Sequence, residues 1–201
     1  MTACRERGGE AQPLKLAPPA SPELVGALED RLGKPLPVAL SDVLTGFSGS
    51  VEVTWTLPDD AEPDGANEST WGECAWSLDG IARAEASRQA WVAECFPNRD
   101  EPYDLVWHDK LGIIEVRNGD VVAIDVSRTP APVVYLSHDD GEGHGLVLGT
   151  DFSDFIDRWT GIGCVGPEDW TWLPFCGDSE PALDPDSAAA ATWRRWMGLP
   201  V

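Results

Sequence analysis

The sequence has few basic residues, no long apolar run and no paired-cysteine motif, and each absence excludes a class of function. Only 14 Lys and Arg accompany 35 Asp and Glu, which gives the 201-residue chain a formal net charge of −21 at pH 7. Nucleic-acid binding depends on Lys and Arg that displace counterions, so this balance argues against a nucleic-acid partner. Anionic membrane surfaces would also repel the chain. A basic protein would instead be attracted, although the same charge could serve solubility alone.

The sequence also lacks motifs that would indicate a membrane or secreted location or a bound cofactor. No apolar run approaches the roughly 20 residues that a membrane-spanning helix needs, and residues 1–22 lack the apolar centre of a secretory signal. Five cysteines without a CxxC pair indicate free thiols rather than a disulfide framework. No Walker A motif occurs, so nothing indicates a P-loop nucleotide site. We therefore expect a cytoplasmic protein that needs no cofactor.

Local signals predict one α+β domain at residues 21–175, with a flexible tail before it (1–20) and an acidic linker and docking helix after it (176–201). A serine cap and a first-turn proline begin a helix at Pro22, and Gly33 ends that helix. A second short helix should pack against the first as a hairpin. The two helices and the strands that follow are expected to share one hydrophobic core.

The apolar period changes to two after the second helix. Apolar and polar residues alternate from Val51 to Leu57, which is typical of a half-buried strand. Residues 78–95 fit a helix, Thr150 is the expected cap of another, and Asn118-Gly119 predicts a tight hairpin turn. These elements predict a twisted mixed or antiparallel sheet with helices packed mainly on one side. Further strand-like segments are 71–76, 103–107, 111–116, 121–126, 133–136 and 146–148.

Three motifs follow one another between Leu24 and Trp159. They are Leu36-Pro37 with Leu40, Leu44, Phe47 and Gly49; Asn118-Gly119-Asp120 with Ile124-Asp125; and Pro132-Val133-Val134-Tyr135-Leu136 followed by acids and residues 152–159. In this order the chain resembles the SUKH superfamily, which includes fungal regulators of cell-wall assembly and bacterial immunity proteins. Ser48 stands where the first motif of that family usually has asparagine. The resemblance implies a SUKH-like α+β domain that binds other proteins, and bacterial members typically neutralise a toxin.

The resemblance and the charge together predict an immunity protein that neutralises a cognate, basic toxin by covering it. Oriented carboxylates opposite Lys and Arg would speed association and reject other partners. The alternative for the same loops is plain solvation. The partner-binding candidates are Asp59, Asp60, Glu62, Asp64, Asp139, Asp140, Glu142, Trp55 and Trp71.

Two other functions remain open. One is an intracellular regulator or scaffold, like the fungal relatives, with no toxin partner. The other is a metal-dependent hydrolase, because the loop 138–144 offers two histidines and three carboxylates, which are side chains that bind divalent metals. Metal ligands usually come from several elements, however, and glycines interrupt this segment as in an exposed loop. We predict no metal site and no enzyme, and the sequence leaves the oligomeric state open.

Two tryptophans and two cysteines of the C-terminal segment each allow two interpretations. Trp170 and Trp172 are interpreted as core residues, with a partner hot spot as the alternative. Cys164 and Cys176 fit a structural role better than a catalytic one, because acidic surroundings disfavour a thiolate. A final helix with Trp193 on its apolar edge should dock onto the domain.

Overall fold

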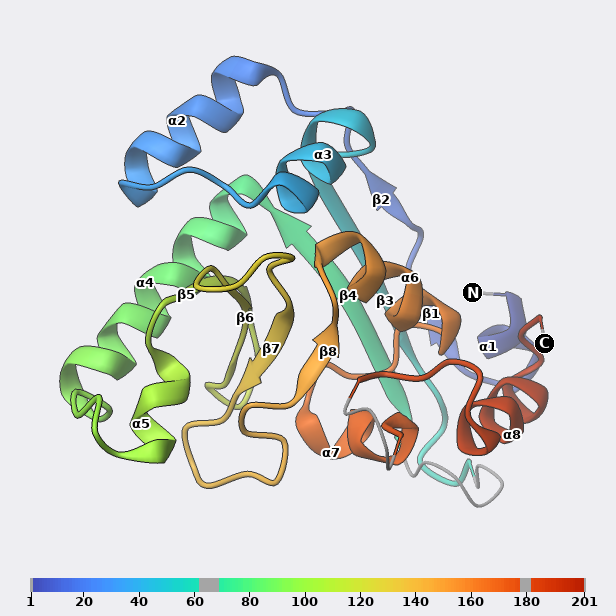
Figure 1. Ribbon diagram of the computed structural model, residues 1–201. Coiled ribbons are helices and arrows are strands. Elements are labelled where there is room, and N and C mark those ends of the chain that lie inside the picture. Colours follow the sequence, from blue (N-terminus) through green and yellow to red (C-terminus); the bar gives the residue numbers. More distant parts are fainter. Residues whose placement is uncertain (1, 62–68, 178–181, 201) are drawn as a thin grey trace.

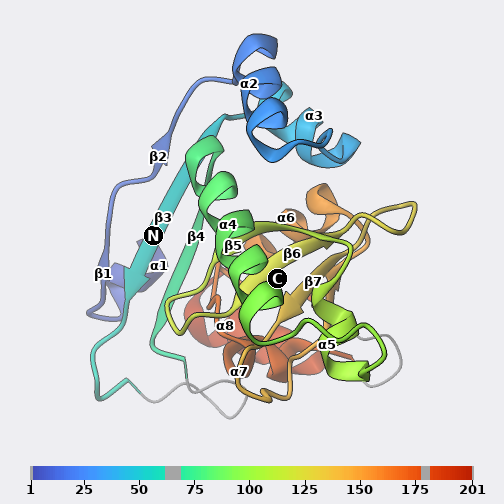
Figure 2. The same cartoon turned by 90° about the vertical axis from the view of Figure 1, so that its left-hand side faces the viewer.

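Two antiparallel four-stranded sheets and the helices around them make up residues 2–61, 69–177 and 182–200, which a computed structural model describes (Figures 1 and 2). The strands are β1 (Glu10–Ala11), β2 (Lys15–Leu16), β3 (Ser50–Thr56), β4 (Trp71–Ser77), β5 (Lys110–Glu115), β6 (Val121–Asp125), β7 (Val133–Leu136) and β8 (Val147–Gly149). The helices are α1 (Thr2–Glu6), α2 (Pro22–Leu32), α3 (Val38–Gly46), α4 (Leu78–Glu94), α5 (Pro102–Trp107), α6 (Phe152–Gly161), α7 (Asp169–Trp172), the 3-10 helix η1 (Leu173–Phe175) and α8 (Ala188–Met197). The α+β domain expected from the sequence is thereby confirmed.

Side-chain caps fix the starts of the longer helices. Ser21 Oγ accepts a hydrogen bond from Leu24 N at the start of α2, and Gly33 ends that helix with a φ of 67°. At α6 the cap is Asp151, whose Oδ1 accepts from Asp154 N at 2.9 Å. The expected cap, Thr150, precedes it by one residue. An aspartate accepts this bond as readily as a threonine, so composition alone places the start only to within a residue.

The first sheet is built around β3, which pairs with β4 on one edge and with β1 and β2 on the other. The segment 1–20, expected to be a flexible tail, therefore contributes two strands and a short helix. An unpaired strand edge presents a row of N–H and C=O groups, and β1 and β2 satisfy them along β3. Strands of two residues are too short to show a period, so the sequence gives no signal for them.

Helices cover both faces of the β5–β8 sheet, whereas we expected them mainly on one side. Along β6, Val121 and Ala123 join a cluster with Trp107 of α5 and with side chains of α4. Val122 and Ile124 belong to the main core, together with side chains of α6. Neighbouring strand residues point to opposite faces, so a strand covered on both faces is apolar throughout.

The segment 103–107, expected to be a strand, is the helix α5. Pro102 occupies the first turn of this helix, a position that tolerates a missing N–H. Trp107 ends it and is fully buried against α4 and β6. A run of four to six apolar residues suits a strand or a helix equally, and only tertiary packing decides between them.

Four tryptophans hold the segment that follows α6. Trp193 donates its indole N–H to the Ile162 carbonyl at 2.9 Å, and Trp55 donates to the Gly163 carbonyl at 2.8 Å. Trp159 and Trp172 both donate to the Val165 carbonyl, at 2.6 and 2.7 Å. These indoles come from α8, β3, α6 and α7, so one short segment ties four elements together. Trp170, in contrast, is 45% exposed.

Candidate functional site

Two acidic loops lie at the same end of the molecule. One follows β3 and contains Asp59 and Asp60, and the other connects β7 to β8 and contains Asp139, Asp140 and Glu142. All five carboxylates are exposed. Figures 1 and 2 show both loops on the side away from α2 and α3, with α7 between them in Figure 1. The candidates Glu62 and Asp64 lie outside the described residues.

The helix α7 links the two loops physically. Asp169, its first residue, accepts a hydrogen bond from Gly143 N in the β7–β8 loop at 3.0 Å. The preceding residue, Glu168, lines a hollow of about 370 Å³ together with Asp59 and Trp71. We call this surface the acidic end and define it by Asp59, Asp60, Trp71, Asp139, Asp140 and Glu142.

Trp71 is an aromatic residue that is partly exposed at the acidic end. Its side chain is partly exposed at the start of β4, and the Arg117 guanidinium lies 5.7 Å from the centre of its ring. Arg117 also pairs with Glu73, so its charge is compensated within the chain. A half-buried indole held by a cation has the rigid, amphipathic character of tryptophans that anchor protein interfaces.

Trp55 lies in the core, which corrects its assignment as a partner-binding residue. The side chain is 5% exposed, and its ring stacks on Trp193 of α8 at a centroid distance of 6.3 Å. Contact with a partner would require α8 to leave. The alternation of β3 places Trp55 on one face, but the residues that cover this face come from a helix far away in sequence.

His144 organises the β7–β8 loop as a neutral imidazole. Its Nδ1 accepts from Ser137 N at 3.1 Å, which assigns the ring proton to Nε2, and Nε2 donates to the Tyr103 carbonyl at 3.0 Å. The ring also stacks on Tyr103 with centroids 3.8 Å apart. Burial lowers the pKa of His144, while the neighbouring hydrogen bonds and carboxylates oppose this effect. Both nitrogens are used, so this side chain has no lone pair left for a metal.

Asp120 joins His138 and Asp139 in a cluster that sequence reasoning missed. Their potential ligand atoms lie within 4.8 Å of one another, and these are the side chains in the described part of the chain that could hold a cation. Asp120 Oδ1, however, accepts from His138 N at 2.9 Å and His138 Nδ1 at 2.7 Å. Its Oδ2 accepts from Tyr135 Oη at 2.6 Å and Asn118 Nδ2 at 2.7 Å. Four donors satisfy this buried carboxylate, so the arrangement serves to fasten the loop to β6.

Asp120 belongs to a motif that the sequence analysis interpreted as a hairpin turn and not as part of a side-chain cluster. It ends the Asn118-Gly119-Asp120 motif of the β5–β6 turn, 18 residues before His138. Burial, together with the hydrogen bond to Asp120 and its charge, raises the pKa of Tyr135 well above its usual range. At neutral pH Tyr135 is therefore protonated and donates its hydroxyl hydrogen to Asp120.

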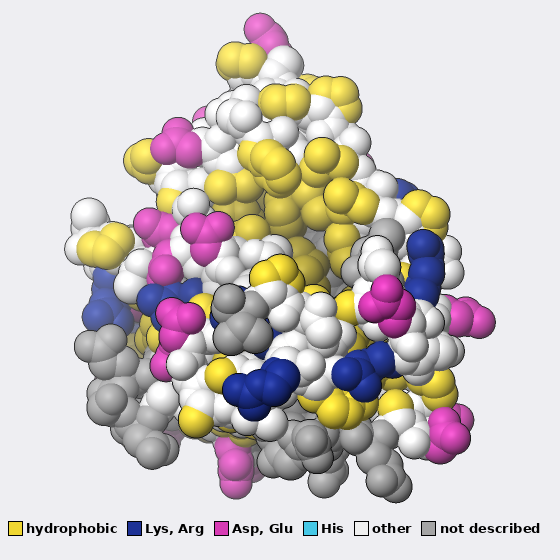
Figure 3. Space-filling view, turned by 90° about the vertical axis from the view of Figure 1, so that its right-hand side faces the viewer, with side chains coloured by type: hydrophobic (Ala, Val, Ile, Leu, Met, Phe, Trp, Pro, Cys, Tyr) yellow, Lys and Arg dark blue, Asp and Glu magenta, His cyan; other side chains and the backbone are white. Residues whose placement is uncertain are grey.

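An apolar groove opens on another face, between β2, the end of α3 and α6. We call it the β2–α6 groove. Leu14, Leu16 and Phe47 form its rim and are each about half exposed. Ile156 of α6 lines the opposite wall, and the volume is about 490 Å³. Figure 3 shows apolar side chains gathered in this hollow.

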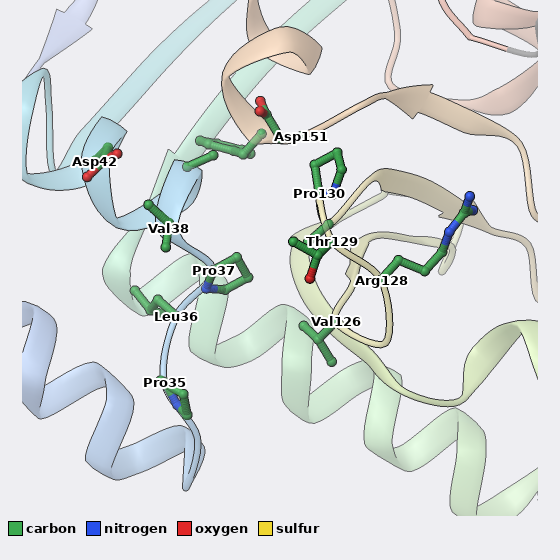
Figure 4. Close-up of a pocket in the computed structure, with 13 residues that line it drawn as sticks. Pro35, Leu36, Pro37, Val38, Asp42, Val126, Arg128, Thr129, Pro130 and Asp151 are labelled. Carbon is green, nitrogen blue, oxygen red and sulfur yellow. The ribbon is translucent and has the colours of Figure 1, made fainter.

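A second apolar hollow lies where residues 35–39 face the β6–β7 loop. Its volume is about 540 Å³, and its lining includes Val38, which is 76% exposed, and Val126. Figure 4 shows Asp42 and Asp151 at its upper edge. Neither hollow was expected, because segments far apart in sequence form each of them.

Residues 19–158 match the family model described as SMI1 / KNR4 family (SUKH-1). This match includes α2 to β8 and most of α6, and it leaves β1, β2, α7 and α8 outside. No curated protein and no solved structure matches the chain. None of the described helices is long and apolar enough to cross a membrane. The chain belongs to the SMI1 / KNR4 family (SUKH-1).

Proposed function

We propose that this protein is a non-enzymatic binding module that neutralises a basic protein toxin in the cytoplasm by covering it with the acidic end. The observation that carries the proposal is that two separate acidic loops meet α7 at one end of the molecule, beside a partly exposed tryptophan. The membership in the SUKH group supports the immunity role, because bacterial proteins of this kind typically neutralise toxins.

The carboxylates of the acidic end are exposed, and Asp139 Oδ1 also accepts a hydrogen bond from Ser137 Oγ at 2.8 Å. In the described ranges the ion pairs of the chain use other acids, such as Glu85, Asp120, Asp125 and Asp154. Asp59, Asp60, Asp139, Asp140 and Glu142 therefore carry charge without a compensating Lys or Arg from the described part of the chain. Such a surface attracts a basic protein at long range and fixes its orientation. Trp71 would then supply the apolar anchor.

A regulatory or scaffold role without a toxin is the second candidate. The two apolar hollows favour it, because they lie on faces other than the acidic end and offer further contact surfaces. Metal-dependent hydrolysis at the loop 138–144 gains no support, since the ring nitrogens of His144 and the carboxylate of Asp120 are already engaged in hydrogen bonds.

Capture from a lysate of the native host, with the full chain as bait and washes at low and high salt, tests the proposal. We expect one basic protein that is retained at low salt and released at high salt. Expression of that protein alone should harm cells, and co-expression of this chain should restore their growth. Capture of several housekeeping or regulatory proteins, none of them toxic, would instead support the scaffold role.

A further inference from the structure

Cys74 of β4 and Cys164, beyond α6, both line the β2–α6 groove and belong to the same buried cluster. Each thiol shifts the pKa of the other, although 90 residues (164 − 74) separate them in sequence. The main chains are also in contact, because a Cβ added at Gly72 would collide with the Cys164 carbonyl, and Glu73 N donates to the Gly166 carbonyl at 2.9 Å. Both cysteines are free thiols.

The segment that carries Cys164 has little freedom to move away from β4. The carbonyls of this segment accept hydrogen bonds from the indole N–H groups of Trp55, Trp159, Trp172 and Trp193. Cys164 itself has a φ of 59°, in the left-handed region that residues other than glycine rarely adopt. Such a conformation persists where the surroundings impose it. Two thiols fixed in contact react with each other at a high effective concentration.

The β2–α6 groove gives small molecules a path to the pair. Cys74 and Cys164 both line this groove, although their exposed fractions are only 2% and 8%. A small uncharged oxidant such as hydrogen peroxide fits a space of about 490 Å³.

We propose that Cys74 and Cys164 form an oxidation site, which closes to an intramolecular disulfide when the protein meets a peroxide. The Cys164 sulfur, as thiolate, attacks one peroxide oxygen and forms a sulfenic acid, and the other oxygen leaves as water after taking up a proton. The Cys74 thiol then displaces the hydroxyl group of that sulfenic acid as a second water, and the S–S bond forms. The two thiols lose two electrons and two protons in total, and the peroxide takes them up.

Cys164 is assigned the first step because it is the more exposed of the two cysteines that line the groove. The neighbouring Cys74 thiol lowers the pKa of Cys164, although burial opposes the effect. The order of the two attacks matches the usual pairing of a more acidic thiol with a resolving partner.

The disulfide would join two parts of the chain that differ in their relation to the family. Cys74 lies within the matched residues 19–158, and Cys164 lies in the C-terminal part outside them. The cross-link would therefore fix the docking of α7 and α8 to the family core. It would raise the unfolding temperature of a chain of this size by roughly 5–10 °C, because it constrains the unfolded state across a long loop.

The test uses the full chain with Cys95→Ser, which removes the exposed thiol that could cross-link two molecules. After treatment with hydrogen peroxide, we expect two fewer titratable thiols and a mass lower by two hydrogens. Peptide mapping should join the segments that contain residues 74 and 164, and reductant should reverse the change. Adding Cys176→Ser, a partly buried thiol without a cysteine partner, should leave the reaction intact, whereas adding Cys74→Ser should abolish it.

Unchanged thiol content in the folded Cys95→Ser protein after peroxide would overturn the proposal. A disulfide that maps to another cysteine pair, or oxidation of Cys164 that adds oxygen without cross-linking, would overturn it as well. None of these readouts depends on toxin binding, so the oxidation site and the proposed function can fail separately.

Discussion

Glu85 of α4 is a buried carboxylate, 2% exposed, with partners on three sides. Arg88 donates two hydrogen bonds to it at 2.8 and 2.9 Å, Lys34 donates at 2.7 Å, and Gly112 N of β5 donates at 2.8 Å. Burial alone would raise the pKa of Glu85, but the hydrogen bonds from Arg88 and Lys34 and the charge of Arg88 lower it to about 2. The charged form thus joins α4 to β5 and to the segment after α2.

Replacing Glu85 by glutamine should lower the free energy of unfolding at pH 7 by about 3–5 kcal/mol, because Arg88 and Lys34 would lose their counter-charge in a largely buried site. Urea unfolding followed by circular dichroism measures this change. The matched control is Glu115→Gln, since Glu115 is exposed and pairs with Arg83 only at 3.9 Å. A surface pair of this kind contributes about 1 kcal/mol or less. Equal losses in the two variants would contradict the account of Glu85.

The same residue predicts how stability depends on pH. The pKa of Glu85 falls from 4.5 to about 2 on folding, so its contribution is present above pH 4.5 and is lost as the pH falls through 2. The loss from this one group amounts to about 3 kcal/mol. Urea midpoints between pH 6 and pH 2 should fall less steeply for Glu85→Gln than for the wild type. Parallel pH profiles would contradict the lowered pKa.

The helix α8 completes the core although it lies outside the residues that match the family. Trp193 is 1% exposed, stacks on Trp55 and Trp196, and donates to the Ile162 carbonyl. Its removal would leave a large cavity and an unsatisfied carbonyl beside Trp55. The helix α8 therefore contributes to the stability of the domain and is not an independent unit.

Trp193→Ala should lower the free energy of unfolding by about 3–5 kcal/mol, which is typical of a large aromatic side chain lost from a core. Trp170→Ala is the matched control, because Trp170 is 45% exposed and bonds to the neighbouring Glu168. We expect the control to cost about 1 kcal/mol or less. Thermal unfolding of both variants provides the comparison. A Trp193→Ala protein as stable as the control would show that α8 does not belong to the cooperative unit.

Elements with local signals could be predicted from the sequence, and elements defined by distant contacts could not. The cap at Ser21, the turn at Asn118-Gly119 and the alternation of β3 each depend on neighbouring residues, and the structure has all three. β1, β2 and α5 depend on what they pack against, so their short segments carried no deciding period. Trp55 and Asp120 were misread or missed for the same reason, because their partners are Trp193 and His138.

The net charge of −21 can attract a basic partner in two ways, through the protein as a whole or through one part of its surface. A general effect would attract a basic partner to any face, and every added positive charge would weaken binding alike. A local effect requires that carboxylates at the acidic end matter more than carboxylates elsewhere. Two exposed residues at the opposite end, Asp30 of α2 and Asp42 of α3, allow a comparison at equal net charge.

Binding of the partner through the acidic end is tested by the affinity of the captured basic protein for two charge-reversal variants, measured by calorimetry at constant salt. One variant carries Asp59→Lys and Glu142→Lys at the acidic end, and the other carries Asp30→Lys and Asp42→Lys, so both change the net charge equally. We predict a Kd that rises by roughly 10- to 100-fold for the first variant and by less than about 3-fold for the second. Equal Kd values for the two variants, whether raised or unchanged, would contradict the proposal that the acidic end covers the partner.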